Sequence, residues 1–105
     1  MSLDMQSAAI RTPTILGALV AKAAAYQEIL DDPHKVRHLA DMLTLAPLMT
    51  GRDLRGEPSL KRLEKRRMGN AVGRARMGAD RDALLAWFPH DLDDRIRRLA
   101  RVQEW

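Results

Sequence analysis

The chain has 105 residues, a length typical of one small domain. Hydrophobic residues make up 46% of it, close to the average for globular proteins, so the composition argues against wholesale disorder. The sequence has no cysteine, which excludes disulfide bridges, thiolate metal sites and a cysteine nucleophile. No apolar stretch is long enough to span a bilayer and no signal peptide is visible, so we expect a soluble cytoplasmic protein without a membrane partner.

Helix-forming residues dominate and β-branched residues are scarce, which predicts an all-α fold. We expect a single domain over residues 1–105, built as a bundle of four to five short helices. Prolines that follow Thr12 and Asp32 are typical of helix starts, and they predict helices over about 13–30 and 33–45. The residues expected to face the core from these two helices are Ile15, Leu16, Leu19, Val20, Ala23, Tyr26, Leu30, Val36, Leu39, Met42 and Leu43.

The segment 47–58 contains two glycines and two prolines and is predicted to be a loop. A third helix is expected over about 59–77, closed by Gly78 in a left-handed conformation. At 100° per residue, one face of this helix is apolar and is expected to pack into the core. That face carries Leu60, Leu63, Met68, Ala71, Val72 and Ala75.

Two further helices are predicted in the last quarter of the chain. Asp80 is expected to cap a short helix that ends near residue 87, followed by a turn at 88–90. Asp91 is expected to cap a final helix that runs to about residue 103. The inward residues of this last helix are expected to be Leu92, Ile96, Leu99 and Val102.

The chain carries a net charge of +4, and the basic excess is concentrated in one region. Residues 51–79 hold nine Lys and Arg against three Asp and Glu, whereas the segments on either side are each slightly acidic. We predict that this basic loop and helix bind the sugar-phosphate backbone of RNA or DNA, independently of base sequence. The candidate side chains are Arg52, Arg55, Lys61, Arg62, Lys65, Arg66, Arg67 and Arg76.

Gly69 and Gly73 complete this candidate site. They are predicted to lie on the solvent face of the third helix, where each glycine costs roughly 1 kcal/mol relative to alanine. The missing side chains would let a phosphate approach the helix backbone between guanidinium groups. Two alternatives remain: the glycines receive another helix, or they end the helix early with Asn70 as a cap. No aromatic residue lies in the segment, which argues against base stacking there.

The sequence contains no motif of a catalytic site, so we expect neither an enzyme nor a cofactor or small-molecule substrate. His34, His38 and Asp41 have a spacing compatible with zinc. Lys35 and Arg37 lie between these residues and would repel a cation. We therefore expect no metal site.

Trp87 and Trp105 supply most of the aromatic surface of the chain. Large rings usually fill the core, and this is one interpretation of both residues. The other is contact with a protein partner, for which Trp105 is the better candidate.

Residues 69–102, about a third of the chain, resemble the C-terminal part of the small helical subunits of class 1 CRISPR effector complexes. The resemblance is carried by Gly73-Arg74-Ala75, Asp80-Arg81, Leu84-Leu85 and Arg95-Ile96-Arg97-Arg98-Leu99. It implies a non-catalytic helical bundle that acts in antiviral defence, lies in several copies along the crRNA-bearing backbone and stabilises guide RNA and target or displaced DNA. It also implies larger protein subunits and copies of the chain itself as partners.

These observations together predict a non-catalytic accessory subunit of a ribonucleoprotein complex that binds a nucleic-acid backbone. Two other classes remain open. A helix-turn-helix regulator would use the last two helices, although the aspartates that begin the final helix would face DNA phosphates unfavourably. An inhibitor or interaction protein would instead dock its basic face on an acidic protein.

Overall fold

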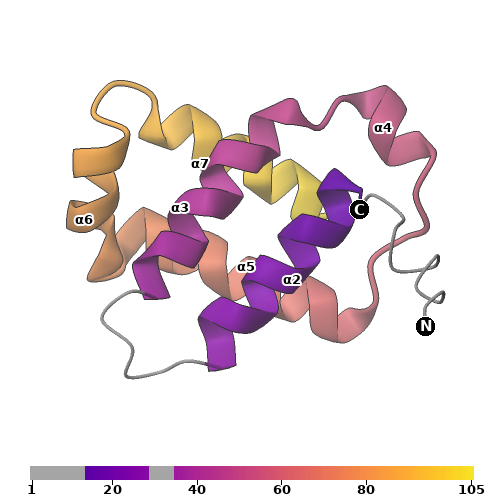
Figure 1. Ribbon diagram of the computed structural model, residues 1–105, viewed down its shortest axis with the longest axis horizontal. Coiled ribbons are helices and arrows are strands. Elements are labelled where there is room, and N and C mark those ends of the chain that lie inside the picture. The colour runs from indigo at the N-terminus through magenta and orange to yellow at the C-terminus, as the bar shows by residue number, and fades with distance from the viewer. Residues whose placement is uncertain (1–13, 29–34) are drawn as a thin grey trace, which may run out of the picture.

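The computed structural model describes residues 14–28 and 35–105, and every regular element in these ranges is helical (Figure 1). The elements are α2 (Ile15–Glu28), α3 (Lys35–Leu45), the 3-10 turn η1 (Ala46–Leu48), α4 (Gly51–Arg55), α5 (Arg62–Met77), α6 (Asp80–Trp87) and α7 (Leu92–Gln103). The prediction of an all-α bundle is confirmed, with six α-helices in the described ranges where four to five were expected. Within the described ranges, no helix is both long enough and apolar enough to cross a membrane.

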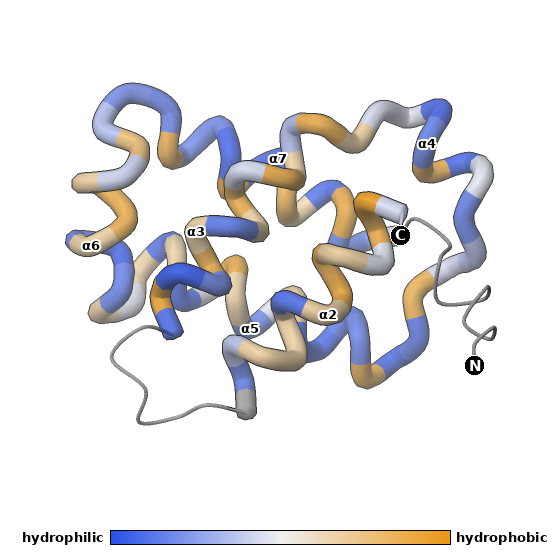
Figure 2. Tube along the Cα trace, in the orientation of Figure 1, coloured by the Kyte–Doolittle hydropathy of each residue, from blue (hydrophilic) through white to orange (hydrophobic). Residues whose placement is uncertain are grey.

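The core lies between α2, α3, α5 and α7. α2 packs against α3 and α5, and α5 also packs against α7 (Figure 1). Figure 2 shows apolar and hydrophilic residues in alternation along α5 and α7, as expected for helices with one buried face. The largest fully buried side chains are Leu19, Leu39, Met42, Leu43, Met68, Leu84, Ile96, Leu99 and Val102. The inward face predicted for the final helix is therefore confirmed.

The segment 47–58 is not the simple loop that its glycines and prolines predict, because it contains the end of η1 and all of α4. A reciprocal cap starts α4. Thr50 Oγ1 accepts a hydrogen bond from the backbone N–H of Asp53, and an Asp53 carboxylate oxygen accepts one from the N–H of Thr50, both at 3.1 Å. The Thr50 N–H lowers the pKa of the Asp53 carboxyl below its ordinary value, because it favours the charged form.

Three predicted caps are wrong in detail, although α5 ends before Gly78 and α7 begins after Asp91 as expected. Gly78 ends α5 in an extended conformation, with φ −85° and ψ 175°, and not in the left-handed region. Asp80 lies inside α6, where its carboxylate accepts a hydrogen bond from Tyr26. Asp91 precedes α7, but its carboxylate binds Arg95 at 2.9 Å and makes no capping hydrogen bond. In each case a tertiary contact or the local backbone overrides the capping preference.

The start of α5 also differs from the prediction. The helix begins at Arg62 and not near residue 59, and the carboxylate of Glu64 accepts a hydrogen bond from the backbone N–H of Lys61 at 2.8 Å. Leu63 was expected in the core but is 50% exposed. It precedes the buried Met68 by five residues, which turns it about 140° away on the helix. The starts predicted at 13 and 33 and the end predicted at 30 lie outside the described residues.

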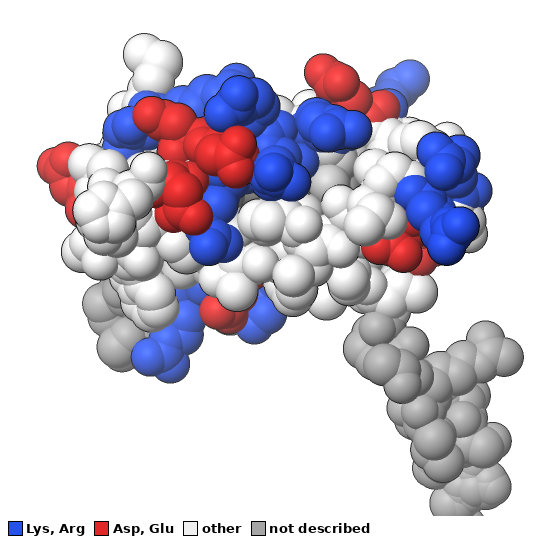
Figure 3. Space-filling model, turned by 90° about the horizontal axis from the view of Figure 1, so that it is seen from above, with Lys and Arg blue, Asp and Glu red and all other residues white. Residues whose placement is uncertain are grey.

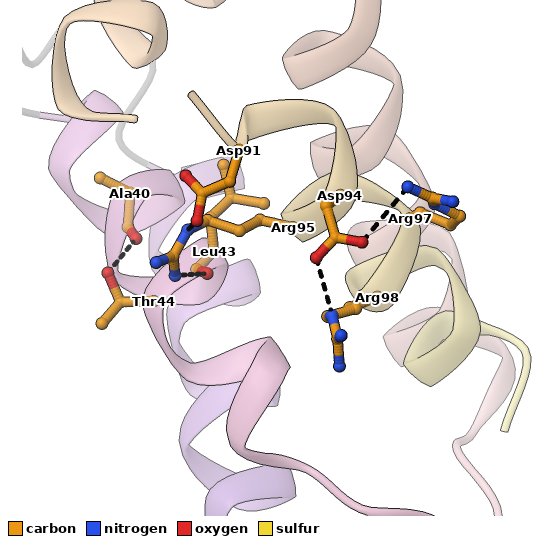
Figure 4. A network of polar contacts seen from close by, with 8 residues as sticks. All are labelled: Ala40, Leu43, Thr44, Asp91, Asp94, Arg95, Arg97 and Arg98. Carbon is orange, nitrogen blue, oxygen red and sulfur yellow. Dashed lines mark hydrogen bonds and ion pairs between the residues drawn. The ribbon is translucent and has the colours of Figure 1, made fainter. Parts of the chain in front are cut away.

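Arg95 ties the end of α3 to α7 (Figure 4). Its Nη1 donates to the backbone carbonyl of Leu43 at 3.0 Å. Pro47, four residues after Leu43, has no N–H to donate to that carbonyl, so the guanidinium supplies the missing donor. The same guanidinium lies over the Phe88 ring, 4.6 Å from its centroid, and binds Asp91 through Nε. Arg95 thus fixes the 88–91 turn as well as the end of α3.

We predict that Arg95→Ala lowers the free energy of unfolding by about 1–3 kcal/mol, because it leaves the Leu43 carbonyl without a donor and removes the contact with Phe88. Arg97→Ala is the matched control on the same helix. The Arg97 side chain is 70% exposed and pairs with Asp94, so its loss should cost less than about 0.5 kcal/mol. Urea unfolding followed by circular dichroism compares the two variants. Equal losses would contradict the role of Arg95.

Tyr26 links α2 to the start of α6. Its side chain is buried, and its hydroxyl donates a hydrogen bond to the Asp80 carboxylate. Burial raises the pKa of the Tyr26 phenol well above its ordinary value, and the neighbouring Asp80 carboxylate raises it further, against an opposing effect of Arg74. Ionised Tyr26 would be a buried anion beside a second anion, so the fold favours the protonated phenol.

The folded protein is therefore expected to keep Tyr26 protonated above pH 10, where the phenol of an unfolded chain ionises. The folded state holds this proton more tightly than the unfolded chain does. The stabilisation that the protonated phenol provides is therefore fully present below about pH 10, and the free energy of unfolding falls as the pH rises above that value. Tyr26 is the only tyrosine, so tyrosinate absorbance reports on it alone. We expect this absorbance to appear only together with loss of helical circular dichroism. Ionisation near pH 10 in a still helical protein would contradict the assignment.

Candidate nucleic-acid interface

The face of α5 that points away from the core carries a row of arginines. The buried residues Met68, Ala71, Val72 and Ala75 define its inner side. Arg62, Arg66 and Gly73 lie on the opposite side at 100° per residue, and all three are exposed, as is Arg76 nearby. In the part of the chain that the structure describes, no ion pair joins Arg62, Arg66 or Arg76 to a carboxylate. Their charges therefore face solvent.

The arginines near the end of the chain are in a different situation. Four of them pair with aspartates: Arg81 with Asp93 (3.0 Å), Arg95 with Asp91 (2.9 Å), Arg97 with Asp94 (3.2 Å) and Arg98 with Asp94 (3.0 Å). Arg98 holds the pKa of the Asp94 carboxyl below its ordinary value. Figure 3 shows acidic and basic atoms intermixed over the region where α7 begins. Within the described ranges, the exposed arginines of α5 thus differ from Arg81, Arg95, Arg97 and Arg98, whose charges are paired with aspartates.

Lys65 and Arg67, which flank the row of exposed arginines, are less accessible than that row. Lys65 is partly buried, and its Nζ donates to the backbone carbonyl of Glu104 at 3.3 Å, just after α7 ends. A cation at this position stabilises the carbonyl end of a helix. Arg67 is also partly buried, while Lys61 is exposed ahead of α5. Lys65 therefore contributes to the packing of α7 on α5.

The two glycines of α5 have different explanations. A Cβ at Gly69 would lie 3.4 Å from Nε2 of Gln103, so Gly69 faces the end of α7, as the helix-packing alternative expects. A Cβ at Gly73 would have no atom within 4 Å, so only Gly73 is open. The alternative that the glycines end the helix early is wrong, because α5 continues to Met77 and Asn70 does not cap it. The Asn70 side chain instead donates to Gln27 Oε1 at 3.3 Å.

An open hollow lies beside Gly73, between α5 and α2. It is lined by Gln27, Gly69, Asn70, Gly73 and Arg74. The lining offers two side-chain amides and a guanidinium beside the open backbone at Gly73. This chemistry is suited to an anion such as a phosphate group.

Arg52 and Arg55 do not belong to the α5 face. Both are exposed on α4, which lies at the upper right of Figure 1 while α5 runs along the lower side of the molecule. A cluster of basic atoms at the same end is visible in Figure 3. Arg55 lines a hollow there with Arg101 and Trp105. The ten residues predicted as one site therefore form two separate surfaces. No pattern in the sequence indicated Arg101, because it lies in a segment with a net acidic charge.

The two tryptophans differ in accessibility. Trp105 is partly buried against the core, and its Nε1 donates to the backbone carbonyl of Glu57 at 3.1 Å. Trp87, at the end of α6, is 50% exposed. Of the two residues predicted to contact a partner, Trp87 is the more accessible, while Trp105 makes contacts within the chain.

No group of three or more His, Asp or Glu side chains in the described ranges is arranged to hold a metal ion. His34 lies outside these ranges. Asp41 pairs with Lys22 at 3.0 Å, and Nδ1 of His38 is buried without a hydrogen-bond partner among the described residues.

Comparison of the chain with protein-family models, with curated proteins and with solved structures finds no match. The functional argument therefore depends on the side chains themselves.

Gly73→Ala is expected to raise the free energy of unfolding by about 0.5–1 kcal/mol, because alanine is the better helix former and the added methyl group meets no neighbour. Gly78→Ala should have the opposite effect, since a Cβ there would lie 2.6 Å from the backbone carbonyl oxygen of Arg74. Thermal unfolding of both variants tests this contrast. A less stable Gly73→Ala protein would show that the space beside Gly73 is already filled.

Proposed function

We propose that this protein is a non-catalytic nucleic-acid-binding subunit that contacts the sugar-phosphate backbone through α5. The observation that carries the proposal is the exposure of Arg62, Arg66 and Arg76, without carboxylate partners in the described residues, on the same helix as the open backbone at Gly73. Guanidinium groups bind phosphates through paired hydrogen bonds, and Gly73 leaves room for a strand to approach. Such binding is independent of sequence and weakens with salt.

The resemblance of residues 69–102 to small helical subunits of class 1 CRISPR effector complexes supports a place in a cytoplasmic ribonucleoprotein complex. Larger subunits and further copies of this chain are the partners that it suggests. Arg95, Arg97 and Arg98, which carry part of the resemblance, pair with aspartates of this chain. The proposal therefore assigns the phosphate contacts to α5 and leaves RNA and DNA as equal candidates.

A sequence-specific regulator is the less favoured function. α6, the 88–91 turn and α7 follow one another as in a helix-turn-helix, with α7 in the position of the recognition helix. However, the Asp93 side chain is 77% exposed in the first turn of α7. A carboxylate there would repel DNA phosphates, so backbone binding through α5 fits the charges better.

The proposal is tested by the double variant Arg62→Ala/Arg66→Ala. If each arginine contacts one phosphate, the slope of log affinity against log salt concentration should flatten by roughly 0.7–0.9 per contact, for unrelated sequences alike. The matched control is Arg37→Ala/Arg97→Ala, which removes the same charge from exposed positions on α3 and α7. Filter binding at several salt concentrations measures all three proteins, and circular dichroism verifies that they fold.

Equal affinity and slope in the α5 variant and its control would contradict the proposal. A loss confined to one nucleic-acid sequence would favour the regulator. A protein that binds acidic polypeptides but no nucleic acid would be an interaction protein.

A further inference from the structure

The hollow between α4 and the end of α7 combines basic side chains with an aromatic ring. Arg55, Arg101 and Trp105 line it together with Gly51, Leu54 and Glu104. Its volume is about 390 Å³, within the range of about 300–1,000 Å³ that is typical of small-ligand sites. These side chains are brought together only by the fold, because α4 and the end of α7 are distant in sequence.

The side chains that line this hollow carry two positive charges and one negative charge. No ion pair engages Arg55 or Arg101 within the described ranges, and Glu104 is the acidic residue in the lining. An adjoining hollow shares Gly51, Leu54 and Arg101 and adds Arg98. An anion at this end of the molecule therefore meets the guanidinium groups of Arg55 and Arg101, while that of Arg98 is paired with Asp94.

The indole of Trp105 is held in a defined orientation. Its Nε1 donates to the backbone carbonyl of Glu57 at 3.1 Å, and the ring packs against the core while remaining partly exposed. The adjacent Glu104 is held by Lys65 of α5 through its backbone carbonyl. A ring fixed in this way loses little conformational entropy when a ligand stacks on it.

We propose that this hollow binds single-stranded nucleic acid, with one base stacked on Trp105 and the flanking phosphates paired with Arg55 and Arg101. The inference rests on the proposed function and adds the class of substrate. An aromatic platform between cations is the arrangement that single-strand-binding proteins use, because every base has a face that stacks. Bases inside a duplex are already stacked on one another and do not reach such a ring. The α5 face binds any phosphate backbone, whereas this hollow selects unpaired strands.

The test uses the variant Trp87→Phe, in which Trp105 is the only tryptophan left. Trp87 is half exposed, so its replacement should not disturb the fold. Oligothymidylate and oligouridylate should quench the Trp105 fluorescence on binding, and a mixed-sequence DNA duplex should not. In this background Arg55→Ala/Arg101→Ala should weaken binding of the single strands more than binding of the duplex, whereas Arg37→Ala/Arg97→Ala should not discriminate between them.

Trp105→Ala should weaken single-strand binding by roughly 5- to 150-fold, the usual effect of removing a stacking platform. Trp105→Phe keeps a smaller ring against the core and loses the hydrogen bond to Glu57. It replaces the alanine variant in the test if that variant does not fold. It should bind single strands more tightly than the alanine variant and still prefer them to duplex.

The outcomes separate this inference from the function on which it rests. If single strands and duplex bind equally without quenching, and Arg62→Ala/Arg66→Ala weakens both, the α5 proposal holds and the single-strand site is overturned. If quenching persists and the α5 variant binds as the parent protein does, the α5 proposal fails and the single-strand site holds. Quenching by polyglutamate as strong as that by oligothymidylate would identify an acidic peptide site and overturn the inference.

Discussion

The placement of carboxylates at the starts of helices determines where this molecule stays positive. Asp53 lies in the first turn of α4, Glu64 in that of α5, Asp80 and Asp82 in that of α6, and Asp93 and Asp94 in that of α7. Negative charge is favourable there because the first backbone N–H groups of a helix have no intrahelical acceptor. α5 has 16 residues and a single carboxylate, in its first turn, so the arginines farther along the helix have no acidic neighbour on their own helix. α6 and α7 keep acids and bases within reach of one another, and four of their five arginines pair with aspartates, whereas no ion pair in the described ranges engages Arg101.

Packing then decides which part of α5 carries the charge. α5 contacts α2 on one side and α7 on the other, and its buried stripe of Met68, Ala71, Val72 and Ala75 is narrow and mostly small. Arginine side chains are too long and too strongly hydrated for these contacts, so they occupy the remaining arc of the helix. Gly69 belongs to the contact with α7, and Gly73 lies on the free arc. The basic face is therefore a consequence of how the helix is buried.

The sequence predicted the long periodic helices well, because an apolar residue every three or four positions has one low-energy arrangement in a bundle. It failed where a tertiary contact competes with a local preference. Asp80 is a good capping residue, yet its carboxylate accepts a hydrogen bond from Tyr26, 54 residues away. α4 was missed because its capping box lies in a segment dominated by glycine and proline, which are stronger signals of a loop. The predicted basic site was wrong as a single surface for a related reason. The net charge of residues 51–79 groups Arg55 with the arginines of α5, whereas the fold brings Arg55 beside Arg101 and Trp105.

The end of α7 connects the two basic surfaces. Gln103 donates to the backbone carbonyl of Lys65 at 3.4 Å, Lys65 donates to that of Glu104, and Trp105 donates to that of Glu57. These contacts join the end of α7 to α5 and to Glu57, just after α4. If the proposed function holds for both surfaces, one strand that contacts both would bind as to a bivalent site, because the second contact forms at a high effective concentration once the first is made. The three contacts around residues 103–105 would then influence the path of that strand as well as the stability of the fold.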